Sequence, residues 1–160
     1  MRKDKYKSYI KLIIWIITLM LVGSVIGGLT KSSVDTWYQT LSRSPLTPPD
    51  YVFGIAWSIL YAMIAVSGWL IWEAKSCSNI KLIKRLYVSQ LILNWMWTPL
   101  FFSYHLTELA LICLTMIITL VSILIVKAYQ NLSSASLLLI PYLLWLLFAS
   151  HLNFHIWQYN

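Results

Sequence analysis

Long runs of apolar residues follow one another along the whole chain, separated by short polar stretches. Each run is close to the roughly 20 residues that a helix needs to cross a bilayer core. The runs lie at residues 9–29, 51–72, 82–104, 106–126 and 135–157. Their cores contain no Asp, Glu, Lys or Arg. The pattern therefore predicts an all-α membrane protein, a single domain (1–160) built as a bundle of five transmembrane helices.

The composition supports a membrane protein and argues against other classes. Of the 160 residues, 59% are hydrophobic and 11% are charged, whereas about a quarter of a soluble domain is charged. The net charge is +7, but Lys and Arg gather in loops and tails, so no nucleic acid is expected as a partner. Cys77 in a loop and Cys113 in an apolar run indicate neither a disulfide framework nor a metal site.

The distribution of Lys and Arg predicts an orientation. Lys31 and Arg43 lie between the first two runs, and the other ten basic residues lie in the N-terminal tail or in alternate loops, Lys75 among them. Cytoplasmic loops carry an excess of positive charge. We therefore expect the N-terminus in the cytoplasm, and the C-terminus and residues 30–50 outside.

The start of the second run combines a helix-start signal with an aromatic stripe. Thr47 is a suitable N-cap before two prolines, and Asp50 is favoured in the first turn by the helix dipole. Phe53, Trp57 and Tyr61 fall within about 80° of one another on a helix. Such a stripe is typical of helix packing, and it would equally form one wall of a cavity.

The third run places two amides among aromatic rings. Gln90, Asn94, Trp97 and Phe101 share a face about 60° wide. Amides at membrane depth cannot face lipid cheaply, so this face must point into the protein. Either the amides form structural hydrogen bonds between helices, or they are polar points in a ligand cavity.

The fifth run has a comparable face. Pro141 is expected to bend this helix. After it, five residues share a sector of about 80°, namely Tyr142, Trp145, Ala149, Asn153 and Ile156. The small Ala149 leaves room on that face, which favours a cavity wall.

Residues 30–50 form the one long connection, with Trp37, Tyr38 and three prolines. Long loops in compact bundles are usually functional, which favours a lid over the cavity. The alternative is a belt of aromatic residues at the depth of the lipid headgroups.

The sequence lacks the residues that several kinds of chemistry require. Ion-coupled transport generally needs a charge inside the membrane, and hydrolysis needs a nucleophile with a base. His151 and His155 are spaced i, i+4 and could face a metal or haem iron, but a third ligand is missing, so no metal is predicted.

Three stretches together resemble one family. PLTPPDYVFGIAWSILY, QLILNWMWTPLFF and PYLLWLLFASHLNFHIWQYN are similar to the bacterial type of the tryptophan-rich sensory protein/translocator protein family, also called the peripheral-type benzodiazepine receptor family. The resemblance runs from about Trp37 to the C-terminus, with these stretches in the family's order.

The resemblance implies a homodimer of five-helix bundles in a bacterial cell membrane, with a pocket roofed by the first loop. The implied ligands are porphyrins such as protoporphyrin IX and haem, sterols and benzodiazepine-site drugs, with no resident cofactor. Bacterial members are implied to promote degradation of protoporphyrin IX that depends on light and oxygen. Trp57 and Trp145 match the tryptophans of that reaction, whereas Tyr38, Phe53, Asn94, Tyr142 and Ala149 match other pocket positions.

The helix faces add Tyr61, Gln90, Trp97 and Asn153 to the candidate ligand-binding residues. Two departures from the family are visible. Leu46 stands where an aromatic residue is common, and Phe154 and Gln158 replace the Tyr and the basic residue of the cholesterol motif, which argues against tight sterol binding.

Three hypotheses follow for function. The protein binds tetrapyrroles and promotes photo-oxidative degradation of protoporphyrin IX; it is a passive tetrapyrrole or sterol transporter or sensor without chemistry; or it is an assembly protein whose helices serve only as contacts.

Overall fold

The computed structural model describes residues 2–74 and 79–160, with side chains from Tyr6 onward, and these residues contain helices and no strand. The elements in chain order are α1 (Arg2–Asp35), α2 (Trp37–Thr40), α3 (Asp50–Glu73), α4 (Ile80–Thr98), the π-helical turn η1 (Pro99–Ser103), α5 (Thr107–Tyr129), α6 (Ser133–Leu137) and α7 (Ile140–Tyr159). The prediction of an all-α fold is confirmed for this part of the chain. Lys75 and Cys77, which entered the charge and cysteine arguments, lie outside the described residues.

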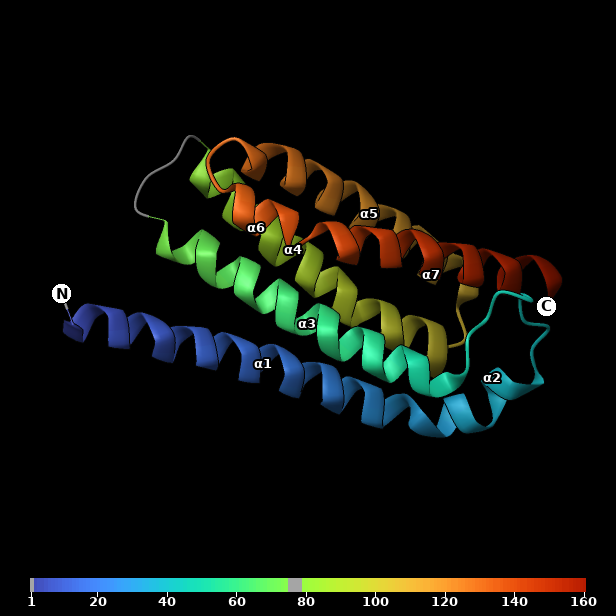
Figure 1. Cartoon of the computed structure of the whole chain (residues 1–160). Coiled ribbons are helices and arrows are strands. Elements are labelled where there is room, and N and C mark those ends of the chain that lie inside the picture. The colour runs from blue at the N-terminus through green and yellow to red at the C-terminus, as the bar shows by residue number, and fades with distance from the viewer. Residues whose placement is uncertain (1, 75–78) are drawn as a thin grey trace.

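The long helices lie side by side in one elongated bundle (Figure 1). α1 packs along α3 at one side of the bundle, and α5 packs against α4 and α7. The start of α1 and the end of α7 lie at opposite ends, and α2 lies at the same end as the C-terminus (Figure 1). The predicted lid segment therefore covers one end of the bundle.

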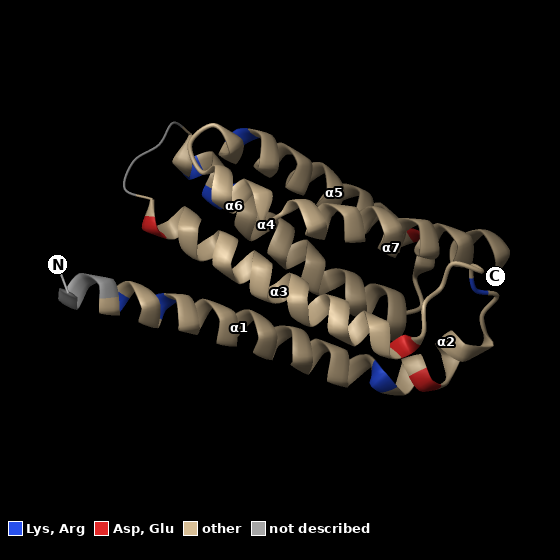
Figure 2. Cartoon of the chain, in the orientation of Figure 1, with Lys and Arg blue, Asp and Glu red and all other residues tan. Residues whose placement is uncertain are grey.

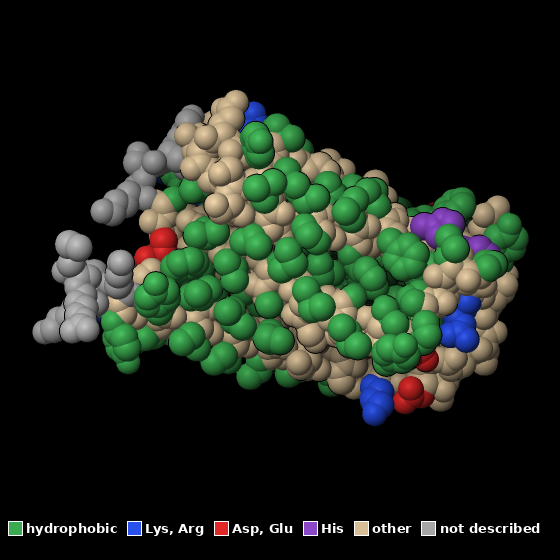
Figure 3. Space-filling view, viewed as in Figure 1, with side chains coloured by type: hydrophobic (Ala, Val, Ile, Leu, Met, Phe, Trp, Pro, Cys, Tyr) green, Lys and Arg blue, Asp and Glu red, His purple; other side chains and the backbone are tan. Residues whose placement is uncertain are grey.

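Four helical stretches are long and apolar enough to cross a membrane: Tyr6–Asp35, Asp50–Glu73, Thr107–Tyr129 and Ser133–Tyr159. Charged residues lie toward the helix ends (Figure 2), and hydrophobic side chains cover the middle of the face shown in Figure 3. α4 is less apolar because Lys81, Lys84 and Arg85 lie in its first two turns. A crossing by α4, and with it the count of five, stays a prediction.

The connection after α1 is shorter than the expected 30–50. α1 continues as a helix to Asp35, with the Thr30 hydroxyl donating to the carbonyls of Ile26 and Gly27 at 3.2 and 3.1 Å. A satisfied hydroxyl costs little inside a helix, which explains why the polar end of the run stays helical. The connection between α1 and α3 consists of residues 36–49, including α2, and is called the lid below.

The start of α3 differs from the expected N-cap. Pro49, which has no side-chain donor or acceptor, holds the cap position, so the prediction of Thr47 as N-cap is wrong. The Thr47 N–H instead donates to the Ser44 carbonyl at 2.9 Å in a turn. Asp50 lies in the first turn as expected.

Helices that the hydrophobic pattern had joined are interrupted near two prolines. Proline has no N–H and its ring crowds the preceding turn. At Pro99 the backbone widens into η1, where the Tyr104 N–H donates to the Pro99 carbonyl at 3.0 Å. The expected single helix of 135–157 consists of α6 and α7, which are separated by a turn at Leu138 and Leu139, and Pro141 lies in the first turn of α7.

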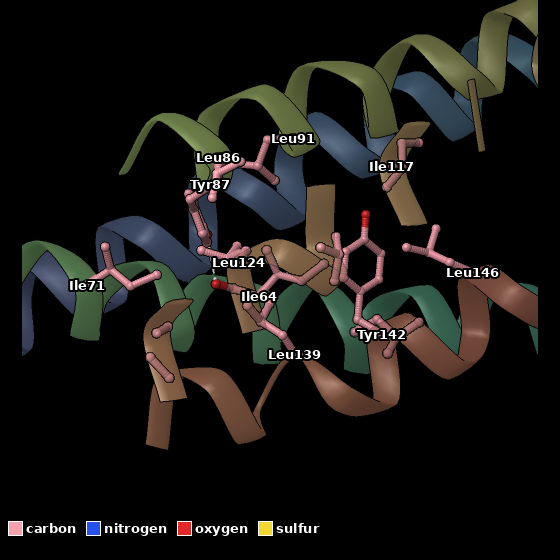
Figure 4. Close-up of a cluster of buried hydrophobic side chains, with 14 of the residues drawn as sticks. Ile64, Ile71, Leu86, Tyr87, Leu91, Ile117, Leu124, Leu139, Tyr142 and Leu146 are labelled. Carbon is pink, nitrogen blue, oxygen red and sulfur yellow. Dashed lines mark hydrogen bonds between the residues drawn. The ribbon is translucent and has the colours of Figure 1, made fainter. Parts of the chain in front are cut away.

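The core of the bundle lies between α3, α4, α5 and α7. The side chains of Ile64, Tyr87, Leu124 and Tyr142 are completely or almost completely buried there (Figure 4). The Tyr87 hydroxyl donates to the Ile64 carbonyl at 2.8 Å, an interaction drawn in Figure 4. This satisfies the one polar atom of that side chain, as burial requires.

α1 contributes little to this core. Leu19 and Thr30 are its buried residues among the side chains that the structure describes. Near the start of α1, Glu73 accepts hydrogen bonds from Ser8 at 2.7 Å and Lys11 at 2.8 Å. The helix is therefore fixed by polar contacts at one end, while most of its surface is available to lipid.

Candidate functional site

A cavity of about 630 Å³ lies at the lid end of the bundle. It is bounded by the second half of α1, by α2, by the first half of α3, by the junction of α4 and η1, and by the second half of α7. Its walls are mostly apolar side chains with a few hydroxyl, amide and charged groups. Volumes of about 300–1,000 Å³ with this composition are usual for small-molecule sites.

The aromatic stripe of α3 forms one wall. Phe53, Trp57 and Tyr61 all line the cavity, because residues four apart lie above one another on a helix. The ring centroids of Trp57 and Tyr61 are 5.5 Å apart, with 33° between the ring planes. The wall therefore presents a nearly continuous aromatic surface.

The facing wall comes from α4, η1 and α7. Trp97 and Phe101 stack with centroids 5.6 Å apart, and both line the cavity with Ala149 and Asn153. Asn153 is 2% exposed; its amide donates to the Thr107 carbonyl at 2.8 Å and accepts from the Trp97 indole at 3.3 Å. Asn153 thus fixes the Trp97 ring in addition to lining the cavity.

Tyr38 of α2 forms the roof. It is 5% exposed and packs edge-on against Phe101 and Phe102, at 6.2 and 5.5 Å. Burial raises the pKa of Tyr38, although the Arg43 guanidinium, 5.4 Å from the ring centre, acts in the opposite direction. The phenol is therefore neutral over the physiological pH range.

The lid is held to the bundle by a few polar contacts. The Ser42 N–H donates to the Asn160 side chain at 2.8 Å, and the Asn160 amide donates back to the Ser42 carbonyl at 3.2 Å. Gln39 donates to Asp50 at 3.0 Å. Such exposed contacts break easily, so the roof is the least firmly held part of the site.

Three of the predicted ligand-binding residues lie behind the cavity wall. Gln90, Asn94 and Tyr142 are 0%, 3% and 0% exposed and are absent from the lining. They form a hydrogen-bonded chain behind Tyr61, which does line the cavity. Their helix faces point inward as predicted, but at a deeper level of the bundle.

Trp145 lies on the other side of the α3 wall. It borders an apolar groove of about 390 Å³ between α3 and α7 on the outside of the bundle. Its ring meets Phe53 and Trp57 edge-on, at 5.9 and 6.5 Å. Of the two tryptophans predicted for photo-oxidation, the structure places Trp57 at the cavity and Trp145 behind it.

The candidate list missed the contribution of α1. Gly23, Gly27, Gly28 and Lys31 line the cavity, across from Gly54 of α3. Gly27, Gly28 and Gly54 are also exposed on the outside, and a Cβ at any of them would meet nothing within 4 Å. The cavity therefore opens sideways between α1 and α3. The only available signal was the glycine spacing on α1.

His151 and His155 both lie on α7. In the described part of the chain, no three His, Cys, Asp or Glu side chains come together as they would around a metal ion. His151 lies 3.4 Å from the Ser44 hydroxyl, and the His155 ring lies 4.5 Å from that of Tyr159. Both are placed to contact other residues at the lid end of α7.

Comparison with known proteins gives a consistent result. The model of a family described as "TspO/MBR family" matches residues 15–158. The tryptophan-rich protein TspO of Archaeoglobus fulgidus is 37% identical over 153 residues, which cover 96% of this chain and 99% of that protein. The human translocator protein is 34% identical over 126 residues, covering 78% and 75% of the two chains. The tryptophan-rich sensory protein of Cereibacter sphaeroides is 29% identical over 126 residues, covering 79% and 78%.

Proposed function

Because this chain belongs to the TspO/MBR family of multi-pass membrane proteins, we propose that its cavity binds tetrapyrroles such as protoporphyrin IX and haem. The tetrapyrrole is a ligand or substrate here, not a resident cofactor. The observation that carries the proposal is the cavity of about 630 Å³ with Phe53, Trp57 and Tyr61 on one wall and Trp97 and Phe101 on the facing one. Flat macrocycles stack on such rings.

The rim of the cavity suits the propionate groups of a porphyrin. Lys31 lies at the lid end of α1 and lines the cavity, and Arg43 already partners Asp50 at 3.8 Å. Lys31 is therefore the cation that we assign to a propionate, while the macrocycle occupies the apolar interior. Asp35, one turn further along α1, limits how much negative charge the rim accepts.

The proposed topology has α4 as the fifth membrane crossing. Lys81, Lys84 and Arg85 then lie at the cytoplasmic headgroups. Because basic residues favour the cytoplasmic side, the N-terminus lies in the cytoplasm and the lid lies outside a bacterial cell membrane. The inward-facing amides of α4 explain how a helix of lower hydropathy crosses the bilayer. A homodimer and weak binding of sterols or benzodiazepine-site ligands belong to the same proposal.

We assign the photo-oxidative reaction to Trp57. Protoporphyrin IX is the compound oxidised and molecular oxygen is the oxidant. The Trp57 indole would give one electron to the light-excited macrocycle, which passes it to oxygen to form superoxide. The indole radical would then regain an electron from the macrocycle, and the resulting porphyrin radical cation would combine with superoxide, so that the net change is addition of O2 to the porphyrin. Trp145, with its ring centre 6.5 Å from that of Trp57, acts through Trp57 and not by touching the ligand.

Illumination of the purified protein with protoporphyrin IX in air tests this assignment. The Soret band should decay more slowly with Trp57→Phe than with wild type, and Trp145→Phe should have a smaller effect. Trp157→Phe is the matched control, since that ring is 42% exposed at the end of α7. Equal decay in the wild type and the Trp57 variant would remove Trp57 from the reaction.

Passive carriage or sensing is the second candidate function, and the side opening between α1 and α3 favours it. A hydrophobic ligand could enter from the bilayer through that opening without any chemistry. This hypothesis predicts saturable quenching of tryptophan emission by protoporphyrin IX and no protein-dependent product in light. An assembly protein would show no saturable quenching at all.

A further inference from the structure

Four polar side chains form an unbroken hydrogen-bonded chain from the cavity wall into the core. The Tyr61 hydroxyl donates to Asn94 Oδ1 at 2.8 Å, and Asn94 Nδ2 donates to the Tyr142 hydroxyl at 2.9 Å. The Tyr142 hydroxyl donates to Gln90 Oε1 at 3.0 Å. Three helices, α3, α4 and α7, are joined by this chain, and Tyr61 is its one member that lines the cavity.

The chain has a direction. Each hydroxyl or amide in it donates to the next member on the inner side, and Gln90 is the last. The Gln90 Nε2 atom is buried and finds no hydrogen-bond partner among the residues that the structure describes. In the amide orientation of this structure the Gln90 carbonyl oxygen accepts from Tyr142 at the inner end of the chain, and this acceptor directs the chain inward.

The direction determines what Tyr61 offers to a ligand. A phenol has one hydrogen and two lone pairs. Because the Tyr61 hydrogen is committed to Asn94 and the Trp95 indole lies within reach of one lone pair of its oxygen, the remaining lone pair can accept a hydrogen bond from the cavity, and the hydroxyl cannot donate one. In a mostly apolar cavity, one such acceptor distinguishes ligands that carry an N–H from ligands that carry only a carbonyl.

We propose that Gln90 is a positioning residue that directs the Tyr61–Asn94–Tyr142 chain inward, so that Tyr61 selects flat hydrophobic ligands bearing an N–H donor. The inference rests on the proposed role of the cavity as a ligand site, but not on tetrapyrroles in particular. The proposal gives a role to Gln90, Asn94 and Tyr142, which do not line the cavity but are hydrogen-bonded in a chain to Tyr61, which does.

Removal of the inner acceptor should reverse the chain. In Gln90→Met the Tyr142 hydroxyl loses its acceptor and can donate to Asn94 Oδ1 once the Asn94 amide turns over. Asn94 Nδ2 then donates to Tyr61, whose hydrogen is released toward the cavity. Tyr142→Phe frees the Asn94 amide in the same way, so both variants convert Tyr61 from an acceptor into a donor.

Three tricyclic compounds of nearly the same shape are suitable probes. Carbazole carries an N–H donor, fluorenone carries a carbonyl acceptor, and fluorene carries neither. Binding is measured by equilibrium dialysis against protein in lipid nanodiscs, with empty nanodiscs subtracted. The measured quantity is the ratio of carbazole affinity to fluorenone affinity. Partitioning of each compound into the lipid is the same for every variant, so it cancels when the ratios of two variants are compared.

The wild type should favour carbazole relative to Tyr61→Phe, and Gln90→Met and Tyr142→Phe should lower the ratio by about fivefold, the effect of one ordinary hydrogen bond. Ile92→Met places the same side chain on the exposed face of α4 and should leave the ratio unchanged. In Asn94→Leu, which cuts the chain, the additional Gln90→Met change should have no effect on the ratio.

An unchanged ratio in both Gln90→Met and Tyr142→Phe would overturn the inference, and either variant suffices if the other does not fold. Fluorene separates this failure from failure of the proposed function. If fluorene binds saturably while the ratio does not respond, the cavity is a ligand site without the proposed selection. If none of the three compounds binds, the proposed selection fails, and the titration with protoporphyrin IX decides separately whether the proposed function holds.

Discussion

Helices α1 and α3 run beside each other along the bundle, with aromatic rings between them near Trp15 and a cavity between them near the lid. At the packed end, Gly68 allows close approach, and Trp15 lies with its ring centre 5.2 Å from that of Trp72 and 5.8 Å from that of Tyr87. At the lid end, Gly27 and Gly54 border the open cavity.

The same residue type thus has opposite consequences in the two regions. A Cβ on Gly68 would collide with the Tyr87 hydroxyl and would lie 3.1 Å from the Trp15 ring, because α4 supplies a ring that occupies the space. A Cβ on Gly27 or Gly54 would meet nothing within 4 Å. Gly68 leaves room for a ring of α4 and Gly23 leaves room for the Tyr61 ring of α3, whereas Gly27 and Gly54 border open space.

Of the substitutions that test this difference between the two regions, Gly68→Leu should lower the free energy of unfolding the most. The added side chain must displace Tyr87 and Trp15, and overpacking of a tight interior costs about 3 kcal/mol. Gly54→Leu is the matched control, and it should leave the free energy of unfolding nearly unchanged. Thermal unfolding in detergent measures both variants, and equal losses would show that the two ends do not differ in packing.

Trp15→Leu should weaken the packed end while leaving the cavity intact. The loss of the tilted contact to Trp72 and the edge-on contact to Tyr87 should lower the free energy of unfolding by about 2 kcal/mol. Quenching of tryptophan emission by protoporphyrin IX should keep its midpoint, because Trp15 is not part of the cavity lining. A shifted midpoint would indicate that the two ends are coupled.

Glu73→Gln should have a smaller effect, limited to the attachment of α1. Exposed ion pairs such as Lys11–Glu73 contribute little to stability, so the Tm should hardly change. The start of α1 should become more mobile, as measured by a spin label near Ser8. High salt should produce the same mobility in the wild type. An unresponsive label would assign the attachment to the aromatic rings and to the hydrogen bond from the Trp69 indole to the Ser8 carbonyl, at 3.1 Å.

The smallest expected effect concerns the lid and pH. Burial raises the pKa of Tyr38 above its ordinary value of 10.0, so the neutral phenol favours the closed lid. This contribution is fully present below pH 10 and is lost as the pH rises through the higher folded value. The difference in phenolate absorbance between wild type and Tyr38→Phe should therefore appear late in an alkaline titration. Its appearance at pH 10 would place Tyr38 in water.

The sequence predicted which way side chains point better than how deep they lie. The α3 stripe reached the cavity because its three rings occupy neighbouring turns at one end of the helix. Gln90 and Trp97 share a helix face but are separated by about 10 Å along the axis, so one lies in the core and the other at the cavity. The direction in which a side chain points from its helix follows from the helical periodicity. Whether that side chain reaches the cavity or the core depends on where along the bundle the neighbouring helices leave space.

Other parts of the site depend on contacts that no local pattern encodes. Trp145 shares a sector with Ala149, but it sits at the edge of that sector, where α3 separates it from the cavity. The role of α1 depends on the absence of side chains at Gly27 and Gly28. The breaks at Pro99 and just before Pro141 follow from the missing N–H, but whether a proline bends a helix or divides it depends on the packing around it.

We propose above all that a flat hydrophobic ligand occupies the space between α1 and α3 under the lid. Gly27→Phe, which fills that space from α1, tests it most directly when protoporphyrin IX is titrated against tryptophan emission. Val25→Phe, on the exposed side of the same helix, is the control. We predict that Gly27→Phe weakens binding by about tenfold or more, roughly 1.4 kcal/mol, with an unchanged Tm, while Val25→Phe binds like the wild type. Binding of wild-type strength by a folded Gly27→Phe protein would contradict the account.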